Sequence, residues 1–169
     1  MALEVRGRTD AAVLVPLYLE GDELHAVFTK RREDMRRHAG EISFPGGRYD
    51  EGESDLRATA LREAEEEIGL PRTEVRLLGE LPATSTFATN YVIHPFVGVI
   101  PEGLALRPNP SEVASILLFR LEELRAGFAL RRLVRRGLPI RTPTYVIGEH
   151  LIWGATARIL GELLDRLGS

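Results

Sequence analysis

Two neighbouring runs decide the fold and the site: GGRYDEGE at residues 46–53 and REAEEEIGL at residues 62–70. If the second run is helical, Glu63, Glu66 and Glu67 stand at i, i+3 and i+4 and share one face. Like charges at this spacing destabilise a helix in water by about 0.2–0.5 kcal/mol per pair. A divalent cation removes that penalty, and Mg²⁺ prefers carboxylate oxygens. The runs therefore predict a metal site for a phosphate-bearing substrate.

The glutamate run also has a simpler interpretation, because runs of like charge usually form a solvated helix face. The surrounding residues favour the metal site. Gly46 and Gly47 let the backbone approach a ligand closely, Pro45 stiffens the entry to this turn, and Arg62 directly precedes the carboxylates. Glu65 has no place in the pattern, so we expect it to be solvated.

Hydrophobic periodicity and turn residues predict an α/β protein with a mixed sheet flanked by helices. Strands are expected at residues 11–19, 24–29, 75–81, 92–100, 115–119 and 145–147, with an extended segment at 42–44. The first two strands are expected to form a hairpin. Further helices are expected at 121–129 and 151–167. Trp153, the only tryptophan, is predicted to lie on the apolar face of the last helix and pack in the core.

The helix that carries the carboxylates is expected to begin after an N-cap, Ser54, with Asp55 in its first turn. Gly69 and Pro71 are expected to end it. Its inward face is predicted to be an apolar stripe: Leu56, Ala60, Ala64 and Ile68.

Together these residues resemble the box of the Nudix hydrolases. The box reads glycine, five residues, glutamate, seven residues, then Arg-Glu-apolar-any-Glu-Glu-any-Gly-apolar. This chain departs from it once, because eight residues separate Glu53 from Arg62. The coenzyme A pyrophosphatase branch looks similar in carrying that longer spacing. The extra residue leaves Glu51 and Asp55 as alternatives to Glu53. The matching positions are Gly47, Glu53, Arg62, Glu63, Ala64, Glu66, Glu67, Gly69 and Leu70.

The resemblance implies an α/β/α sandwich in which the box forms a loop–helix–loop. It also implies a divalent cation, Mg²⁺ or Mn²⁺. The main ligands would be Glu63 and Glu67, with Glu66 close by and the carbonyl of Gly46 as a backbone ligand.

Arg62 has two interpretations. It can be a surface partner of Glu66, one helical turn away. The resemblance implies instead that Arg62 holds Glu53 and so orients the site without touching the substrate. Some carboxylate must also take a proton from the attacking water. Glu66 and Glu112 are both candidates, and the sequence does not separate them; Glu112 has the further reading of a surface loop carboxylate.

The run FTKRREDMRRHAGEISFPGG at residues 28–47 points to a branch of the family. It is similar to the coenzyme A pyrophosphatase pattern, in which Thr-Lys-Arg leads to apolar-Arg-any-His-any-Gly and then Phe-Pro-Gly-Gly. Residues 152–158, IWGATAR, also resemble that branch. Coenzyme A carries a pyrophosphate and a 3′-phosphate, and arginine suits bidentate phosphate contacts. The candidate substrate-binding residues are Arg31, Arg36, His38 and Gly47, although His38 can equally be a packing residue at the loop base.

The first hypothesis is metal-dependent hydrolysis of coenzyme A or an acyl-coenzyme A to adenosine 3′,5′-bisphosphate and 4′-phosphopantetheine or its acylated form. One alternative keeps the chemistry with ADP-ribose, NADH or another nucleoside diphosphate derivative as substrate. Another is a Nudix-like domain that senses a nucleotide without cleaving it. The intact glutamate set argues against that reading.

Length and composition limit the number of domains, the kinds of binding partner and the location that we expect. A chain of 169 residues suits one domain, so a single Nudix domain over residues 1–169 is expected. The net charge of −3 argues against nucleic-acid binding. No stretch approaches the roughly 20 apolar residues of a membrane span. The chain lacks cysteine and an apolar leader, so a cytoplasmic location is expected. The family resemblance allows a homodimer.

Overall fold

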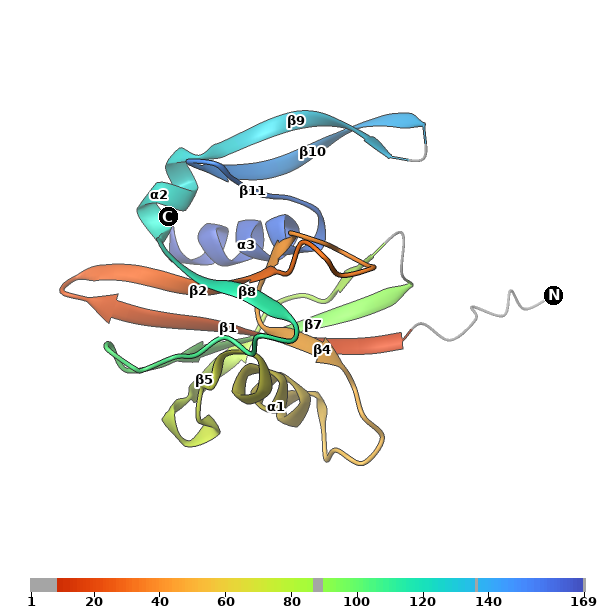
Figure 1. Ribbon diagram of the computed structural model, residues 1–169. Coiled ribbons are helices and arrows are strands. Elements are labelled where there is room, and N and C mark those ends of the chain that lie inside the picture. Colours follow the sequence, from red (N-terminus) through yellow and green to blue (C-terminus); the bar gives the residue numbers. More distant parts are fainter. Residues whose placement is uncertain (1–8, 87–89, 136, 169) are drawn as a thin grey trace.

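A central strand, β1 (Thr9–Glu20), is apolar on both faces and anchors the larger of two sheets (Figure 1). It pairs antiparallel with β2 (Glu23–Arg31) and with β4 (Gly46–Arg48), and parallel with β7 (Tyr91–Val99). The computed structural model describes residues 9–86, 90–135 and 137–168, so the leader expectation at the N-terminus lies outside the described residues. Within those residues the larger sheet holds β1, β2 (Glu23–Arg31), β3 (Ile42–Ser43), β4 (Gly46–Arg48), β5 (Arg76–Glu80), β6 (Thr84–Ser85), β7 (Tyr91–Val99) and β8 (Val113–Arg120).

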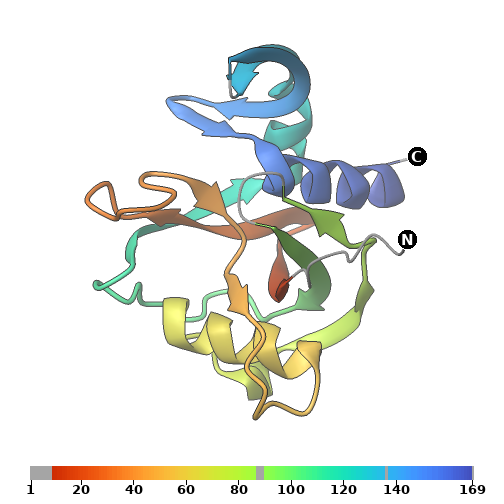
Figure 2. The same cartoon turned by 90° about the vertical axis from the view of Figure 1, so that its right-hand side faces the viewer.

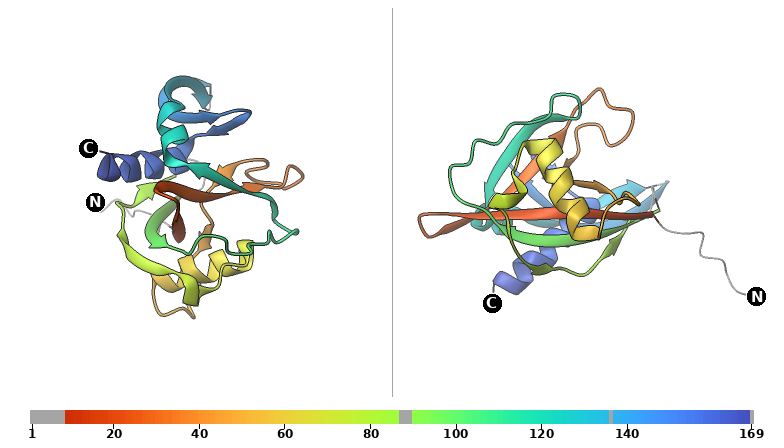
Figure 3. Two further views of the ribbon diagram at one scale, coloured as in Figure 1. Left: turned by 90° about the vertical axis from the view of Figure 1, so that its left-hand side faces the viewer. Right: turned by 90° about the horizontal axis from the view of Figure 1, so that it is seen from below.

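Helices cover both faces of this sheet. α1 (Leu56–Ile68) packs on one face and α3 (Gly154–Leu167) on the other (Figures 1 and 2). Alternate residues of β1 serve the two sides: Leu14 packs with the α1 side chains, whereas Val15 packs with those of α3. Figure 3 shows α1 lying across the sheet. The α/β sandwich with a mixed sheet is therefore confirmed.

A smaller sheet lies beyond α3 (Figure 1). In the described residues it consists of β9 (Phe128–Arg135), β10 (Leu138–Ile147) and β11 (His150–Ile152), all antiparallel. A short helix, α2 (Leu121–Ala126), leads from β8 into it, and a 3₁₀ turn, η1 (Arg72–Glu74), precedes β5. The long hairpin of β9 and β10 projects from the body of the molecule.

Several expected elements have different bounds. The β1–β2 hairpin is confirmed, but the helix expected at 121–129 ends at Ala126, since Gly127 follows and β9 begins at Phe128. The N-cap of α1 is Asp55, not Ser54: its side chain accepts a hydrogen bond from the Ala58 N–H at 2.9 Å. At the other end, Gly69 caps α1 in the left-handed region, at φ 65°.

The beginning of the last helix was predicted wrongly. Residues 150–152 form β11 instead, because Ile152 pairs with Tyr145 of β10. Trp153 is extended at the N-cap of α3, and its side chain is only partly buried. It therefore lies outside the core in which it was expected. Among the described residues, no helix is long and apolar enough to cross a membrane.

Candidate active site

The glycine turn lies between the sheet and α1. Gly46 and Gly47 begin β4, and Gly47 pairs with Ala12 of β1. A Cβ atom added to Gly46 would collide with the carbonyl oxygen of Ala12, and one added to Gly47 would meet the Glu63 carboxyl carbon at 2.5 Å. Gly46 therefore permits the close strand pairing, and Gly47 permits a carboxylate from α1 to lie against the turn.

Arg62 stands at the centre of the acidic side chains. Its Nη2 lies 3.0 Å from Glu53 Oε1, and its Nη1 lies 3.0 Å from Glu63 Oε1 and 3.2 Å from Glu66 Oε2. Nη2 also donates to the Arg48 carbonyl oxygen at 3.2 Å. Both contacts foreseen for Arg62 are thus present, because one planar guanidinium carries several donors in a fixed geometry.

The extra residue before Arg62 left Glu51, Glu53 and Asp55 as candidates for its acidic partner, and in the structure Glu53 is that partner. Its Oε1 accepts hydrogen bonds from Arg62, from the hydroxyl of Thr59 at 3.0 Å and from the Asp50 N–H at 3.1 Å. Although burial raises its pKa, these hydrogen bonds outweigh burial, so the pKa of Glu53 lies below its ordinary value. Of the two alternatives, Asp55 is used as the helix cap and Glu51 is exposed.

Glu67 and Glu63 are the two carboxylates of the site whose pKa is raised by burial. Burial, followed by the charge of Glu63, raises the pKa of Glu67 to about 8. Burial also raises the pKa of Glu63, against the opposing effect of Arg62. Glu67 Oε2 accepts a hydrogen bond from the Gly46 N–H at 3.2 Å. In the described part of the chain, Glu67 has no ion-pair partner.

A divalent cation fits these donors. Two partly buried carboxylates beside a backbone turn offer the oxygen ligands that hard cations prefer, and a cation would stabilise the ionised form of Glu67. In the arrangement described, Arg62 draws Glu63 and Glu66 to itself while Glu67 binds the Gly46 N–H. Because Glu63 and Glu66 turn toward Arg62 and Glu67 toward the Gly46 N–H, the described residues contain no group of three acidic or histidine side chains close enough together to hold a metal ion.

Two further charged residues border this pair. The loop before β8 is held against the end of α1, where the Asn109 N–H donates to the Glu67 carbonyl oxygen at 2.8 Å. Glu112 in that loop is exposed, and its charge raises the pKa of both Glu63 and Glu67. Arg31 has the opposite effect on the pKa of Glu67. The fold thus brings together residues from four separate segments of the sequence.

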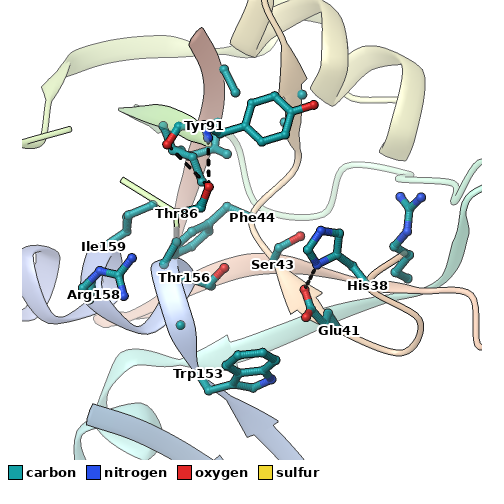
Figure 4. Close-up of a pocket in the computed structure, with 18 of the residues that line it drawn as sticks. His38, Glu41, Ser43, Phe44, Thr86, Tyr91, Trp153, Thr156, Arg158 and Ile159 are labelled. Carbon is teal, nitrogen blue, oxygen red and sulfur yellow. Dashed lines mark hydrogen bonds and ion pairs between the residues drawn. The ribbon is translucent and has the colours of Figure 1, made fainter. Parts of the chain in front are cut away.

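A cavity of about 590 Å³ opens beside the glycine turn. Gly46, Gly47, Arg31 and His38 line it, whereas Arg36 is exposed and outside its lining. The opposite side is formed by Trp153 and the start of α3 together with the β9–β10 hairpin. Figure 4 shows Tyr91 and Trp153 at opposite ends of the cavity, with Ser43 and Phe44 between them.

His38 has an unusual backbone. Its φ of 57° lies in the left-handed region, which non-glycine residues rarely adopt. Its Nδ1 lies 2.9 Å from Glu41 Oε2 (Figure 4), and the Glu41 N–H donates to the His38 carbonyl oxygen at 3.1 Å. Nearby, the Arg31 Nε–H donates to the Arg37 carbonyl oxygen at 2.8 Å. The last residue of β2, Arg31, and the loop that follows it thus present a guanidinium and the His38 imidazole to the cavity.

Sequence reasoning missed several residues of the site. The fully buried hydroxyl of Thr59 contacts Glu53, and the Tyr49 hydroxyl donates to the Glu53 carbonyl oxygen at 3.0 Å. A threonine among apolar stripe positions was the available signal for the first. Trp153 lies in the run 152–158 that resembles the coenzyme A pyrophosphatase branch, but its place in the cavity, like that of the β9–β10 hairpin, depends on the packing of the smaller sheet.

The protein is an α/β domain with a mixed sheet between two helix layers. Its acidic side chains are grouped around Arg62, next to the glycine turn that lines the cavity. This class of domain has a site that suits a divalent cation and a phosphate anhydride. The NUDIX domain model matches residues 8–137, so the chain belongs to the Nudix family. It is a hydrolase of pyrophosphate bonds, the class of enzyme that generally uses a divalent cation.

Relatives and solved structures agree with the family assignment. The chain is 38% identical to an uncharacterized Nudix hydrolase, NudL, of Photorhabdus laumondii over 93% of this chain and 84% of the relative. It is 36% identical to NudL of an Enterobacter species, over 99% and 88%.

Two solved structures share the fold at low sequence identity. A MutT/nudix family protein from Enterococcus faecalis superposes with a TM-score of 0.68 at 14% identity, over 99% of this chain and 64% of that one. The NUDIX domain of Shewanella oneidensis NrtR, complexed with ADP ribose, superposes with a TM-score of 0.66 at 14% identity, over 96% and 90%.

The two glycines are expected to fail differently when replaced by alanine. Gly47→Ala meets the flexible end of Glu63, so it should leave the protein folded and displace that carboxylate, lowering kcat/KM by about 10- to 100-fold. Gly46→Ala meets backbone and Val13, so it should reduce the free energy of unfolding by about 1–3 kcal/mol. Urea denaturation and steady-state kinetics on both variants check this. Equal losses of stability would contradict it.

Proposed function

We propose that this protein is a coenzyme A pyrophosphatase acting on coenzyme A or its acyl derivatives, carried by a single domain over residues 1–169. Water adds across the pyrophosphate: one bridging P–O bond breaks, and the products are adenosine 3′,5′-bisphosphate and (acyl-)4′-phosphopantetheine. The observation that carries the proposal is the position of the carboxylate pair. Glu63 and Glu67 adjoin a cavity with Arg31 and His38 on one side and apolar residues on the other.

The proposed cation site uses Glu63 and Glu67, with Glu66 nearby and the Gly46 carbonyl as a further donor. The buried Glu67 carboxylate, whose pKa is raised to about 8, supports this assignment, since burial without a counter-charge is unfavourable. When bound, Mg²⁺ or Mn²⁺ neutralises charge on the phosphate oxygens and lowers the pKa of a coordinated water. Arg62 and Glu53 are proposed to position this pair through the contacts described above.

The proton of the attacking water requires a base, and Glu66 and Glu112 are the two proposed candidates. Glu66 is ion-paired with Arg62 at 3.2 Å, so its carboxylate is already engaged by another side chain. Glu112 lies close enough to act on the charges of both Glu63 and Glu67. This geometry favours Glu112, and the pH profiles of kcat for Glu112→Gln and Glu66→Gln separate the two roles.

Arg31 at the end of β2 and the basic residues of the loop after it, Arg36 and His38, are proposed to recognise phosphate. Arg31 lines the cavity and its charge reaches Glu67, so it suits the pyrophosphate. Arg36 is exposed outside the lining, where it suits the 3′-phosphate of an extended substrate. His38, when protonated, adds a third donor at the rim, and Gly47 allows close approach of the substrate to the turn.

The test is hydrolysis of coenzyme A with Mg²⁺, compared with 3′-dephospho-coenzyme A and ADP-ribose. We expect coenzyme A to be preferred. Arg36→Ala should raise KM for coenzyme A by about tenfold, the loss of one charge-assisted contact, and leave KM for 3′-dephospho-coenzyme A unchanged. Arg166→Ala, at the far end of α3, is the matched control. An unchanged KM for coenzyme A in Arg36→Ala would remove Arg36 from the substrate site.

ADP-ribose defines the second candidate function. The NrtR domain, which shares the fold, has been solved with that ligand. Preference for ADP-ribose over coenzyme A would keep the carboxylate site and replace the substrate. Binding of these nucleotides with Mg²⁺ but without turnover would favour the sensing domain instead.

A further inference from the structure

The two sides of the cavity differ in chemistry. Arg31, His38 and Glu41 lie on the side of the loop after β2. On the side of the smaller sheet and α3, the large side chains of the lining are Leu133, Ile140, Trp153 and Ile159. Thr142, Thr156 and Arg158 also line this side, and the Arg158 guanidinium donates hydrogen bonds to Thr84 Oγ1 and to the Ser85 carbonyl oxygen. A ligand that fills the cavity therefore has a charged part and an apolar part.

The apolar side continues past the cavity along the β9–β10 hairpin. Leu133 and Ile140 are directly opposed across the two strands, so their side chains lie on the same face. Leu138 is two residues from Ile140 on β10 and shares that face. Ile140 is 42% exposed and Leu138 is 67% exposed. The hairpin thus carries an apolar strip that begins inside the cavity and ends in solvent.

We propose that this strip, Leu133, Leu138 and Ile140 together with Trp153, binds the fatty acyl chain of an acyl-coenzyme A. The inference rests on the proposed function, because the chain is taken to be attached to the substrate whose pyrophosphate lies at the glycine turn. The separation of charge supports the orientation: the phosphorylated nucleotide faces the arginines and the acyl-pantetheine arm runs toward the hairpin. An acyl chain is the expected ligand of the strip because Leu133 and Ile140 also line the cavity, so a chain attached to the bound substrate can pass from the cavity onto the hairpin.

The arrangement predicts a specificity for apolar thioesters. Each methylene group that moves from water onto an apolar surface favours binding, so an acyl chain should improve recognition relative to free coenzyme A. We expect kcat/KM for decanoyl-coenzyme A to exceed that for coenzyme A by about tenfold or more, within the range that apolar pockets achieve. The gain should grow with chain length until the chain passes Leu138.

A matched pair of variants tests the strip. Ile140→Thr keeps a β-branched residue in the strand and makes the strip polar. Leu130→Thr makes the same kind of change on the opposite face of the same hairpin, at a residue that is 52% exposed. The ratio of kcat/KM for decanoyl-coenzyme A over coenzyme A should fall about tenfold in Ile140→Thr and stay at the wild-type value in Leu130→Thr. Leu138→Thr serves if Ile140→Thr does not fold.

A binding measurement separates this inference from the proposed function. Trp153 is the only tryptophan, so its fluorescence reports on the strip in EDTA, where turnover is absent. Decanoyl-coenzyme A should shift the emission at lower concentration than coenzyme A, and Ile140→Thr should abolish the difference.

The outcomes are distinct. If wild-type protein cleaves neither compound, the proposed function fails, and a binding preference that depends on Ile140 still supports the strip. If coenzyme A is cleaved but the acyl chain changes neither kcat/KM nor binding, the strip is overturned while the proposed function stands. Equal effects of Ile140→Thr and Leu130→Thr also overturn it.

Discussion

Replacement of Glu67 by glutamine is expected to lower kcat on the order of 10³-fold, because a charged ligand is removed while the shape of the side chain is kept. Stabilisation of transition-state charge by a bound cation contributes several kcal/mol, and each 1.36 kcal/mol is tenfold in rate. The hydrogen bond from the Gly46 N–H can still be accepted by the amide oxygen. The fold should therefore be retained, and kinetics with Mg²⁺ or Mn²⁺ measure the loss.

The same substitution should stabilise the metal-free protein. The pKa of Glu67 is about 8 in the folded protein against an ordinary value of 4.5. The folded state therefore retains the proton more strongly, and the stability that Glu67 contributes is fully present below pH 4.5 and is lost as the pH rises to about 8. A neutral amide does not incur this loss. Glu67→Gln should thus gain on the order of 0.5–2 kcal/mol at pH 8, and less at pH 5.

Glu65→Gln is the matched control, since Glu65 lies two residues before Glu67 and so on another face of α1, is exposed, and is paired at the surface with Arg72 at 3.2 Å. It should change neither kcat nor stability appreciably. Excess Mg²⁺ should raise the melting temperature of wild-type protein and of Glu65→Gln, and raise it less in Glu67→Gln. Wild-type turnover in Glu67→Gln would remove Glu67 from the metal site.

Local periodicity accounts for what the sequence predicted well. The spacing of Glu63, Glu66 and Glu67 fixes their common face as soon as the segment is helical, and Arg62 reaches Glu66 from the preceding turn. The mixed sheet followed from apolar runs such as that of β1, which is buried on both faces. These features depend on residues close together in the chain, so no knowledge of packing was needed.

The apolar side of the cavity depends on packing and was missed. Residues 128–135, FALRRLVR, alternate irregularly between apolar and basic side chains, so β9 gave no clear strand signal. Residues 151–153 were read as the start of a helix, yet pairing with β10 makes residues 151 and 152 part of a strand and leaves Trp153 at the cavity. The pairing of β10 with both strands decided the outcome, and such long-range pairing overrides local propensity.

Replacement of Arg62 by alanine is expected to have the largest effect on stability. It removes the cation shared by Glu53, Glu63 and Glu66, and the Glu53 side chain is only 11% exposed. Leaving a buried carboxylate without its partner should reduce the free energy of unfolding on the order of 3 kcal/mol. Arg72→Ala, which breaks the exposed pair with Glu65, should change it by less than about 1 kcal/mol. Urea denaturation at pH 7 measures both.

The pH dependence separates the loss of this ion pair from a general loss of packing. The pKa of Glu53 is held below its ordinary value of 4.5 by the hydrogen bonds from Arg62 and Thr59, which outweigh burial. Its contribution to stability is therefore present above pH 4.5 and is lost as the pH falls through the lower folded pKa. The difference between wild type and Arg62→Ala should shrink in acid for that reason, whereas a packing defect would persist at every pH. A loss no larger than that of Arg72→Ala would show that Arg62 does not hold the acidic cluster, and the positioning role proposed for it would have to be abandoned.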